Sequence, residues 1–180
     1  MNTTTYRPKS VNCELRYLVF QTSHGWMGCL SSAVGLLRTT LPQSSPQRAI
    51  EMLSSTIEQA AWAPDSFAEI IPMFTEYFDG KRKEIPCTLD FGHATLFQRQ
   101  VYKIVRSIPY GETRSYSWVA KQIGRPAAVR AVGQALGRNP LPIVVPCHRV
   151  IASNGSLRGF GGGLEMKRNL LRLERLTDHP

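Results

Sequence analysis

The stretch Asn139-Pro-Leu-Pro-Ile-Val-Val-Pro-Cys-His-Arg-Val-Ile151 sets a single cysteine between a proline-bounded apolar run and a polar, glycine-rich tail. Residues 143–145 are all β-branched, so this short run predicts a buried strand. The proline that follows cannot donate a further ladder hydrogen bond, which ends the strand just before the cysteine. The sequence therefore predicts that Cys147 lies at a strand end.

Cys147 is followed at once by His148 and Arg149. A titratable base and a fixed positive charge near the sulfur favour the thiolate over the thiol, which marks a reactive cysteine. A buried, inert cysteine beside a surface histidine is the more common arrangement. The flanking prolines and the following glycine-rich loop favour the reactive interpretation.

Length and composition allow one domain or two small ones. The chain has 180 residues, and its hydrophobic content of 42% is ordinary for a globular protein with a buried core. No apolar run approaches the ~20 residues that a membrane helix needs, and the first residues have neither the basic nor the apolar region of an export signal. These features predict a cytoplasmic protein.

The cysteines form no regular framework. Cys13, Cys29, Cys87 and Cys147 include no C-x-x-C pair, so we expect reduced thiols in a reducing compartment. Cys13 and Cys29 could join His24 and His93 in a zinc site, but the spacing does not require one. We expect no metal and no cofactor.

The net charge of +9 is concentrated in the second half of the chain. Residues 1–94 carry 8 Lys and Arg against 9 Asp and Glu, whereas residues 95–180 carry 14 against 4. An excess of this kind is the electrostatic pattern of a domain that binds a polyphosphate, although a merely solvated basic surface explains it as well. The basic half also contains Cys147.

The first half predicts an N-terminal α/β scaffold domain over residues 1–90. Residues 15–20 and 26–41 are strand-like around a turn at residues 23–25, which predicts a small antiparallel sheet. Ser45-Pro46 opens a helix that covers the sheet, and a second helix is expected to open near Pro72 and end at Gly80. Residues 81–90 are interpreted as a connector.

The second half predicts a mainly helical C-terminal domain over residues 91–180, which makes the fold class α/β (α+β). Thr95 and Gln98 form the capping-box pattern of a helix with one apolar face. Ser115 caps a short helix that ends at Gln122, a turn contains Gly124, and a second helix covers residues 127–136. Short helix, glycine turn and helix form the helix-turn-helix pattern.

The second helix of this pair is rich in small residues, with Arg130 and Gln134 as its main long polar side chains. Small residues let a recognition helix approach a nucleic-acid groove closely, and a tight helix-helix packing face explains them equally well. The basic charge of this half favours DNA.

A glycine-rich loop at residues 158–163 could form one wall of a pocket, since its glycines allow close approach to a ligand. A last helix is predicted over residues 164–176. Glu174 lies near its end, where a carboxylate opposes the helix dipole, so we expect a specific partner to hold Glu174. A solvated surface glutamate is the alternative.

A Cys-His pair suggests acyl-transfer hydrolysis. Adjacent residues of an extended segment point to opposite faces, so His148 would reach the sulfur of Cys147 through a water or a bend at Val150. No glycine elbow surrounds the cysteine. The accompanying DNA-binding pattern favours a nucleic-acid group as the target of this soft nucleophile.

Five motifs together resemble the methylated-DNA–protein-cysteine methyltransferases, which are also called O6-alkylguanine-DNA alkyltransferases. The resemblance covers about residues 95–176. The first half looks like the family's smaller α/β domain with its three-stranded antiparallel sheet. The motifs are Pro146-Cys-His-Arg-Val150, Gly137-Arg-Asn-Pro140, Pro109-Tyr-Gly-Glu-Thr-Arg-Ser-Tyr116, Arg130 and Gly161-Gly-Gly163.

The resemblance implies a role for each matching residue. Cys147 accepts the alkyl group, and His148 with Glu174 deprotonates it through a water. Tyr116 donates to guanine N3, and Asn139 orients the site. The backbone carbonyls of Cys147 and Val150 recognise the guanine amine, and Arg130 fills the space of the flipped nucleotide. The remaining expected DNA or base contacts are Ala128, Gln134, Arg149, Phe160, Gly161 and Gly162.

The implied activity is direct-reversal repair of O6-alkylguanine in double-stranded DNA, with O4-alkylthymine as a second candidate substrate. The expected form is a monomer that is nucleoid-associated when bound to DNA. A paired base cannot reach a buried thiolate, so it is flipped out, and the resulting thioether has no carbonyl for water to attack. Each molecule acts once.

Two positions depart from the family pattern: Phe160 replaces a common tyrosine, and Arg158 replaces a small residue. Both bear on the size of alkyl group that is accepted. Two other functions remain: a non-catalytic alkyltransferase-like protein that binds lesions, and a helix-turn-helix regulator with an incidental cysteine.

Overall fold

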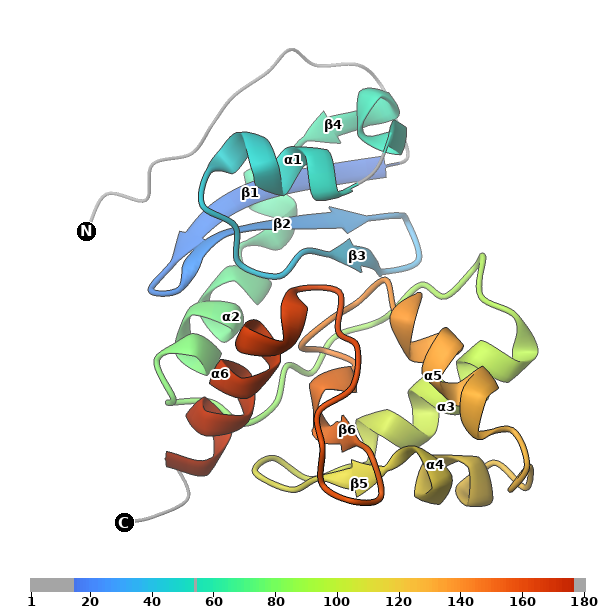
Figure 1. Cartoon of the computed structure of the whole chain (residues 1–180). Coiled ribbons are helices and arrows are strands. Elements are labelled where there is room, and N and C mark those ends of the chain that lie inside the picture. Colours follow the sequence, from blue (N-terminus) through green and yellow to red (C-terminus); the bar gives the residue numbers. More distant parts are fainter. Residues whose placement is uncertain (1–14, 54, 177–180) are drawn as a thin grey trace. The chain divides into compact units, whose positions relative to one another are not determined.

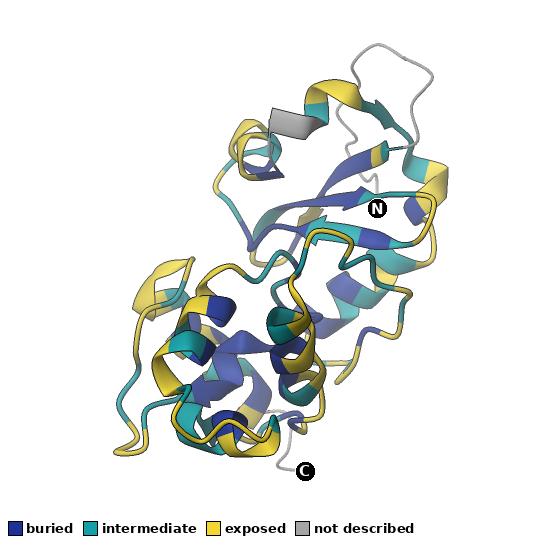
Figure 2. Cartoon of the chain, turned by 90° about the vertical axis from the view of Figure 1, so that its right-hand side faces the viewer, coloured by how far each residue is buried: buried dark blue, intermediate teal, exposed yellow. Residues whose placement is uncertain are grey.

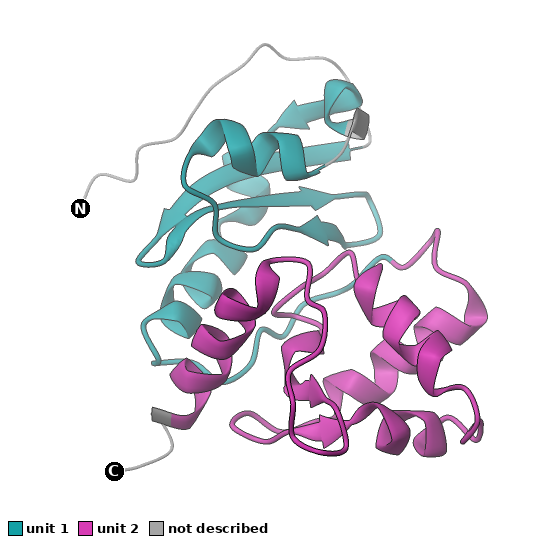
Figure 3. Cartoon of the chain, viewed as in Figure 1, with its two compact units in different colours: residues 1–90 teal, residues 91–180 magenta. Residues whose placement is uncertain are grey.

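The computed structural model describes residues 15–53 and 55–176 (Figure 1). The chain divides into two compact units, residues 1–90 and residues 91–180 (Figure 3). Each unit has a buried interior of its own, drawn in dark blue in Figure 2.

Unit 1 is built on a four-stranded sheet in the order β3-β2-β1-β4. The strands β1 (Leu15–Thr22), β2 (Gly25–Ser31) and β3 (Leu36–Thr39) pair antiparallel, which confirms the prediction for this part. The fourth strand, β4 (Ala60–Trp62), runs parallel to β1, so the expectation of a wholly antiparallel sheet is wrong at this edge. The chain reaches β4 through a helical crossover, and such a crossover returns it parallel.

Helices cover both faces of this sheet. The helix α1 (Pro46–Leu53) packs Ala49 and Leu53 against Tyr17 and Val19 on one face. On the other face Phe20 of β1 meets Phe74 of α2 (Ile70–Phe78) with ring centroids 6.0 Å apart. Because both faces are covered, β1 is buried continuously at residues 17–20, without the alternation typical of a half-exposed strand.

The expected ends of the second helix are close to those observed. The helix α2 begins at Ile70, two residues before Pro72, because proline is tolerated in a first helical turn. It ends as predicted, with Gly80 in the left-handed region at φ 71°. Two short 3-10 helices, η1 (Ser55–Gln59) and η2 (Pro64–Phe67), complete unit 1.

Unit 2 is mainly helical. Its elements are α3 (Leu96–Arg106), α4 (Tyr116–Gln122), α5 (Val129–Gly137), the 3-10 helix η3 (Cys147–Arg149), α6 (Gly163–Leu176), and the two-residue strands β5 (Arg114–Ser115) and β6 (Val150–Ile151). The strands β5 and β6 pair parallel. The predicted capping box is present at α3, since Gln98 N donates to Thr95 Oγ1 and Thr95 N to Gln98 Oε1.

The helices α4 and α5 form the predicted helix-turn-helix. The Ser115 side chain caps α4 as expected. The helix α5 begins at Val129, two residues later than predicted, because residues 125–128 are drawn into the turn. The buried Tyr102 of α3 donates from its hydroxyl to the carbonyls of Ala135 and Arg138, which anchors the end of α5.

The predicted strand at residues 143–145 is wrong, because these residues form a turn. Ile143 has φ 74°, a conformation that a β-branched residue rarely adopts. The residues are buried as expected, since the run is part of the core of unit 2. Burial was therefore predicted correctly and backbone conformation was not.

Within residues 15–53 and 55–176, no helix combines the length and the apolar character that crossing a membrane requires.

Candidate active site

A tight turn presents Cys147 to its surroundings. Pro146, with φ −78° and ψ 65°, lies at the centre of an inverse γ-turn in which Cys147 N donates to Val145 O at 2.7 Å. Cys147 then begins the 3-10 helix η3, so it does not lie at a strand end as predicted. Cys147 and His148 were expected to point to opposite faces of an extended segment. That expectation does not apply, because both residues lie in the 3-10 helix η3.

Asn139 holds this turn together. Its Nδ2 donates to Val145 O at 2.9 Å and its Oδ1 accepts from Leu141 N at 3.0 Å. The same Nδ2 donates to Cys147 Sγ at 3.3 Å. One amide therefore holds a strained backbone and supplies a donor to the sulfur. The family resemblance implies an orienting role for Asn139, and this contact is compatible with that role.

The Cys147 thiol is nearly enclosed, with 8% of the residue exposed. Burial raises the pKa of Cys147, while the Asn139 hydrogen bond and the positive charge of Lys167 oppose that rise. The sequence predicted that His148 and Arg149 would favour the thiolate. In the resting protein the net shift is toward the thiol, so forming the thiolate requires a base.

Lys167 of α6 is completely buried. Its Nζ donates to Val150 O at 2.7 Å and to Arg158 O at 3.3 Å, and it lies 5.8 Å from the centroid of the Tyr116 ring. The ammonium thus ties α6 to β6 and to the glycine-rich loop. Burial lowers the pKa of Lys167, and the Cys147 sulfur opposes that shift.

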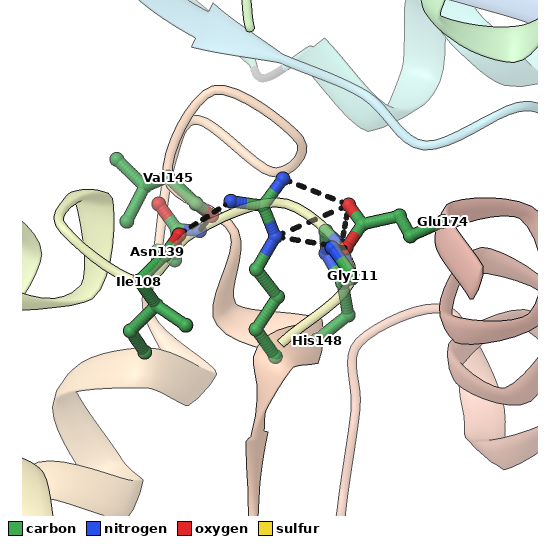
Figure 4. A network of polar contacts seen from close by, with 7 residues as sticks. Ile108, Gly111, Asn139, Val145, His148 and Glu174 are labelled. Carbon is green, nitrogen blue, oxygen red and sulfur yellow. Dashed lines mark hydrogen bonds and ion pairs between the residues drawn. The ribbon is translucent and has the colours of Figure 1, made fainter. Parts of the chain in front are cut away.

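Glu174 joins several segments of unit 2 through one buried carboxylate (Figure 4). Its Oε1 lies 2.8 Å from His148 Nε2, and its Oε2 accepts from Gly111 N at 3.3 Å. Arg149 binds both oxygens, with Nε 2.9 Å from Oε2 and Nη2 2.9 Å from Oε1. The expectation that a specific partner holds Glu174 is confirmed.

The protonation states follow from these contacts. Burial alone would raise the pKa of Glu174, but hydrogen bonds and charge from His148 and Arg149 outweigh it and lower the pKa to about 2. Burial lowers the pKa of His148, against the opposing effect of Glu174. At neutral pH the pair is therefore a carboxylate and a neutral imidazole, and a neutral imidazole can accept a proton.

Arg149 does not lie where a DNA contact would require it. It was expected to contact DNA, but it is buried, with its Nη1 donating to Ile108 O at 2.7 Å and its guanidinium 5.5 Å from the Tyr110 ring centroid. A guanidinium paired with a carboxylate in the interior cannot reach a duplex without breaking that pair. Arg149 holds Glu174.

Tyr116 is half-buried at the first position of α4. Burial raises the pKa of Tyr116, and the nearby Cys147 sulfur adds to the rise. The phenol therefore keeps its proton at neutral pH and can donate a hydrogen bond. A Cβ added at Gly133 of α5 would lie 3.9 Å from the ring, so Tyr116 also borders the second helix of the pair.

The residues expected to contact DNA are more dispersed. Arg130 and Gln134 are exposed one turn apart on α5, and Ala128 is its N-cap residue. Phe160 is half-buried, whereas Gly161 and Gly162 are exposed in the loop before α6. Each carbonyl expected to recognise guanine already accepts one bond, Cys147 O from Val150 N and Val150 O from Lys167. A carbonyl has a second lone pair for a ligand.

Lys167 and Tyr102 support the site and were not among the residues predicted from the sequence. Lys167 lies three residues before Leu170 and seven before Glu174, so all three lie on one face of α6. A lysine at helical spacing from the apolar Leu170 was the available signal. Within residues 15–53 and 55–176, no three His, Cys, Asp or Glu side chains gather as a metal site would require, and Cys13 lies outside these residues.

Comparisons with known proteins point to one family. Residues 96–176 match the family model described as 6-O-methylguanine DNA methyltransferase, DNA binding domain. A methylated-DNA–protein-cysteine methyltransferase of Mycolicibacterium paratuberculosis is 46% identical over 151 residues, which are 81% of this chain and 90% of that protein. One of Mycobacterium bovis is 48% identical over 130 residues, 70% of this chain and 78% of the relative.

A solved structure agrees with these relatives. The Mycobacterium tuberculosis protein crystallised in complex with DNA is 36% identical and superposes with a TM-score of 0.77, over 91% of this chain and 93% of that one. Both units thus have a counterpart in a single known protein. On this similarity and on the geometry around Cys147, the chain belongs to the methylated-DNA–protein-cysteine methyltransferase family.

Proposed function

We propose that this protein repairs O6-alkylguanine in double-stranded DNA by transferring the alkyl group irreversibly to Cys147. Unit 2 binds the duplex and carries the transfer, and unit 1 is its scaffold. The observation that carries the proposal is the surroundings of Cys147, where a donor from Asn139 reaches the sulfur and the next residue begins the His148–Glu174–Arg149 network.

In this proposal His148 is the base that forms the thiolate. Glu174 engages Nε2, so the ring exchanges a proton through Nδ1 and one water with the thiol of Cys147. Glu174, held by Arg149, stabilises the imidazolium that results. The thiol is therefore neutral until substrate is in place, which agrees with the raised pKa of Cys147 in the resting protein.

Transfer forms one carbon–sulfur bond and breaks the bond between that carbon and guanine O6. The departing guanine gains negative charge, and the protonated Tyr116 phenol donates to N3 as that charge develops. Lys167 keeps positive charge beside the sulfur and holds the Val150 carbonyl that borders the base. The product is a thioether, so each molecule acts once.

The helix-turn-helix delivers the lesion. Arg130 and Gln134 extend from α5 into solvent, and Ala128 and Gly133 leave its surface low enough for a groove to approach. Arg130 fills the gap in the DNA base stack after the base is flipped. Phe160 and the glycines that follow it line the pocket that receives the flipped base. When it is bound to DNA, the protein is expected to be associated with the nucleoid.

The decisive experiment measures how many methyl groups the protein accepts. Incubated with excess O6-methylguanine duplex, it is expected to gain one methyl group per chain, mapped by peptide mass to Cys147, and then to stop. Turnover beyond one equivalent, or methylation of Cys29 or Cys87, would contradict the proposal. Binding of the lesion without any methyl transfer would support the non-catalytic alternative, and preference for one operator sequence would support a regulator.

Arg130→Ala tests the flipping step. Because the vacated stack loses its replacement side chain, transfer from duplex DNA is expected to slow by about tenfold to a hundredfold, while transfer from the free modified base changes little. Single-turnover rates on both substrates measure this difference. Equal slowing on the two substrates removes Arg130 from the role.

A further inference from the structure

A groove in unit 2 lies between α6 and the β5–β6 ribbon. It has a volume of about 480 Å³ and is lined by Thr113, Ile151, Gly155, Leu157, Leu171 and three arginines, Arg168, Arg172 and Arg175. One wall is a turn in which Asn154 Oδ1 accepts from the backbone N–H and the hydroxyl of Ser156.

The arginines line up along the groove. Arg168, Arg172 and Arg175 are spaced by four and three residues, which places them on one face of α6, and all three are exposed. Among the described residues none of them forms an ion pair or a side-chain hydrogen bond. Among residues 15–53 and 55–176 no carboxylate lines the groove, since Glu174 is buried on another face of the helix. The described residues that line the groove therefore carry three positive charges and no negative one.

The floor of the groove is apolar. Ile151, Leu157 and Leu171 are all partly exposed there. A phosphate backbone is charged and hydrated, so it would not remove the apolar surface of these three side chains from water. A large apolar side chain would bury them, at roughly 25 cal/mol for each Å² removed from water. An apolar anchor flanked by acidic residues complements both parts of the groove.

The groove also lies apart from α5, the second helix of the helix-turn-helix. In Figure 1, α6 and α5 lie on opposite sides of unit 2, with β5 and β6 between them. A duplex seated on α5 leaves the arginine face of α6 free.

We propose that this groove docks an extended acidic peptide segment of a partner protein, with one large apolar side chain in the cavity and carboxylates on Arg168 and Arg172. This is a second binding surface, separate from the alkyl-transfer site. It brings the repair protein to other machinery without blocking its DNA-binding helix.

The test uses fluorescein-labelled peptides that are glutamate throughout except for one central leucine, isoleucine, methionine, phenylalanine or tryptophan. Fluorescence anisotropy is expected to give a Kd below about 100 µM for at least one of them, and a central serine is expected to abolish binding. In the double variant R168Q/R172Q the affinity is expected to fall about tenfold, since two charge pairs are lost.

The control is K103Q/R106Q, which removes the same charge from exposed positions of α3 and is expected to change the affinity by less than about twofold. Equal losses in the two variants, indifference to the central residue, or no binding by any peptide would overturn the proposal. DNA affinity is measured in parallel. A larger loss of duplex binding in R168Q/R172Q than in the control would make the groove a DNA contact and would also reject the peptide.

Discussion

Cys29 in unit 1 and Cys147 in unit 2 are both buried thiols, but their surroundings differ. Cys29 lies in β2 with no exposure, and burial, with a smaller contribution from Cys87, raises its pKa far above the ordinary value. Cys147 is buried nearly as deeply, yet a donor from Asn139 and the charge of Lys167 oppose the effect of burial on its pKa. Burial therefore disfavours the reactive thiolate form of a cysteine, and polar groups buried beside the sulfur reduce that effect.

The largest expected effect separates the two thiols directly. Cys147→Ser is expected to abolish methyl transfer, because an unactivated hydroxyl is a far weaker nucleophile than a thiolate. Cys29→Ser is expected to keep the capacity of one methyl group per chain and to lower the free energy of unfolding by about 1–3 kcal/mol, since it buries a hydroxyl. Methyl incorporation and chemical denaturation measure the two effects. Loss of transfer in Cys29→Ser with the fold intact would break the comparison.

Glu174→Gln is expected to have the next largest effect. It leaves Arg149 as a buried charge without its carboxylate, at a cost of about 3 kcal/mol in the free energy of unfolding. Loss of the relay is expected to slow transfer about a hundredfold, still with one methyl group per chain. Denaturant titrations and single-turnover rates measure both quantities. An unchanged rate would remove Glu174 from the relay.

The pH dependence of stability sharpens this test. The pKa of Glu174 is lowered from 4.5 to about 2 on folding, so its contribution to stability is fully present above pH 4.5 and is lost as the pH falls toward 2. The stability difference between wild type and Glu174→Gln is therefore expected to shrink over that range. A difference that stays constant down to pH 2 would contradict the lowered pKa.

Lys167→Met tests the charge that Cys147 has and Cys29 lacks. Removing a cation near the sulfur is expected to raise the pKa of Cys147 further, so alkylation by iodoacetamide at pH 7 is expected to slow about tenfold. The difference in alkylation rate between wild type and Lys167→Met is expected to disappear at high pH, where Cys147 is ionised in both proteins. Lys103→Met, at an exposed position of α3, is the matched control. A gap that persists at high pH would indicate altered packing.

Tyr116→Phe is expected to have the smallest effect of the series. It keeps the ring beside Gly133 and removes one donor, so transfer is expected to slow about fivefold with unchanged affinity for DNA. Rapid-quench rates and duplex titrations measure the two quantities. A wild-type rate would reduce Tyr116 to a packing residue.

Local signals predicted much of the fold. The caps at Thr95 and Ser115 and the stop at Gly80 each depend on a few neighbouring residues, and each is present in the structure. Glu174 was also found locally, because a carboxylate at a helix end needs a compensating partner. The helix-turn-helix followed from the same kind of signal.

The remaining features depend on contacts that the local sequence does not contain. Residues 143–145 have the composition of a strand, but Asn139 draws them into a turn with Ile143 at positive φ. Arg149 is basic and follows the cysteine, yet a carboxylate 25 residues away pulls it into the interior. Lys167 belongs to the site only because two carbonyls of unit 2 converge on it.

The separations within the site also order its assembly in time. Asn139 and Cys147 are 8 residues apart, whereas His148 and Glu174 are 26 apart, and Gly111, which also binds Glu174, is 63 residues away from it. Short loops close before long ones during folding, because closing a long loop costs more entropy. We therefore expect the Asn139 hydrogen bond to the sulfur to form early in refolding. The His148–Glu174 pair is expected to form late, when α6 docks. The time at which Cys147 becomes reactive during refolding is therefore expected to report when α6 docks in unit 2.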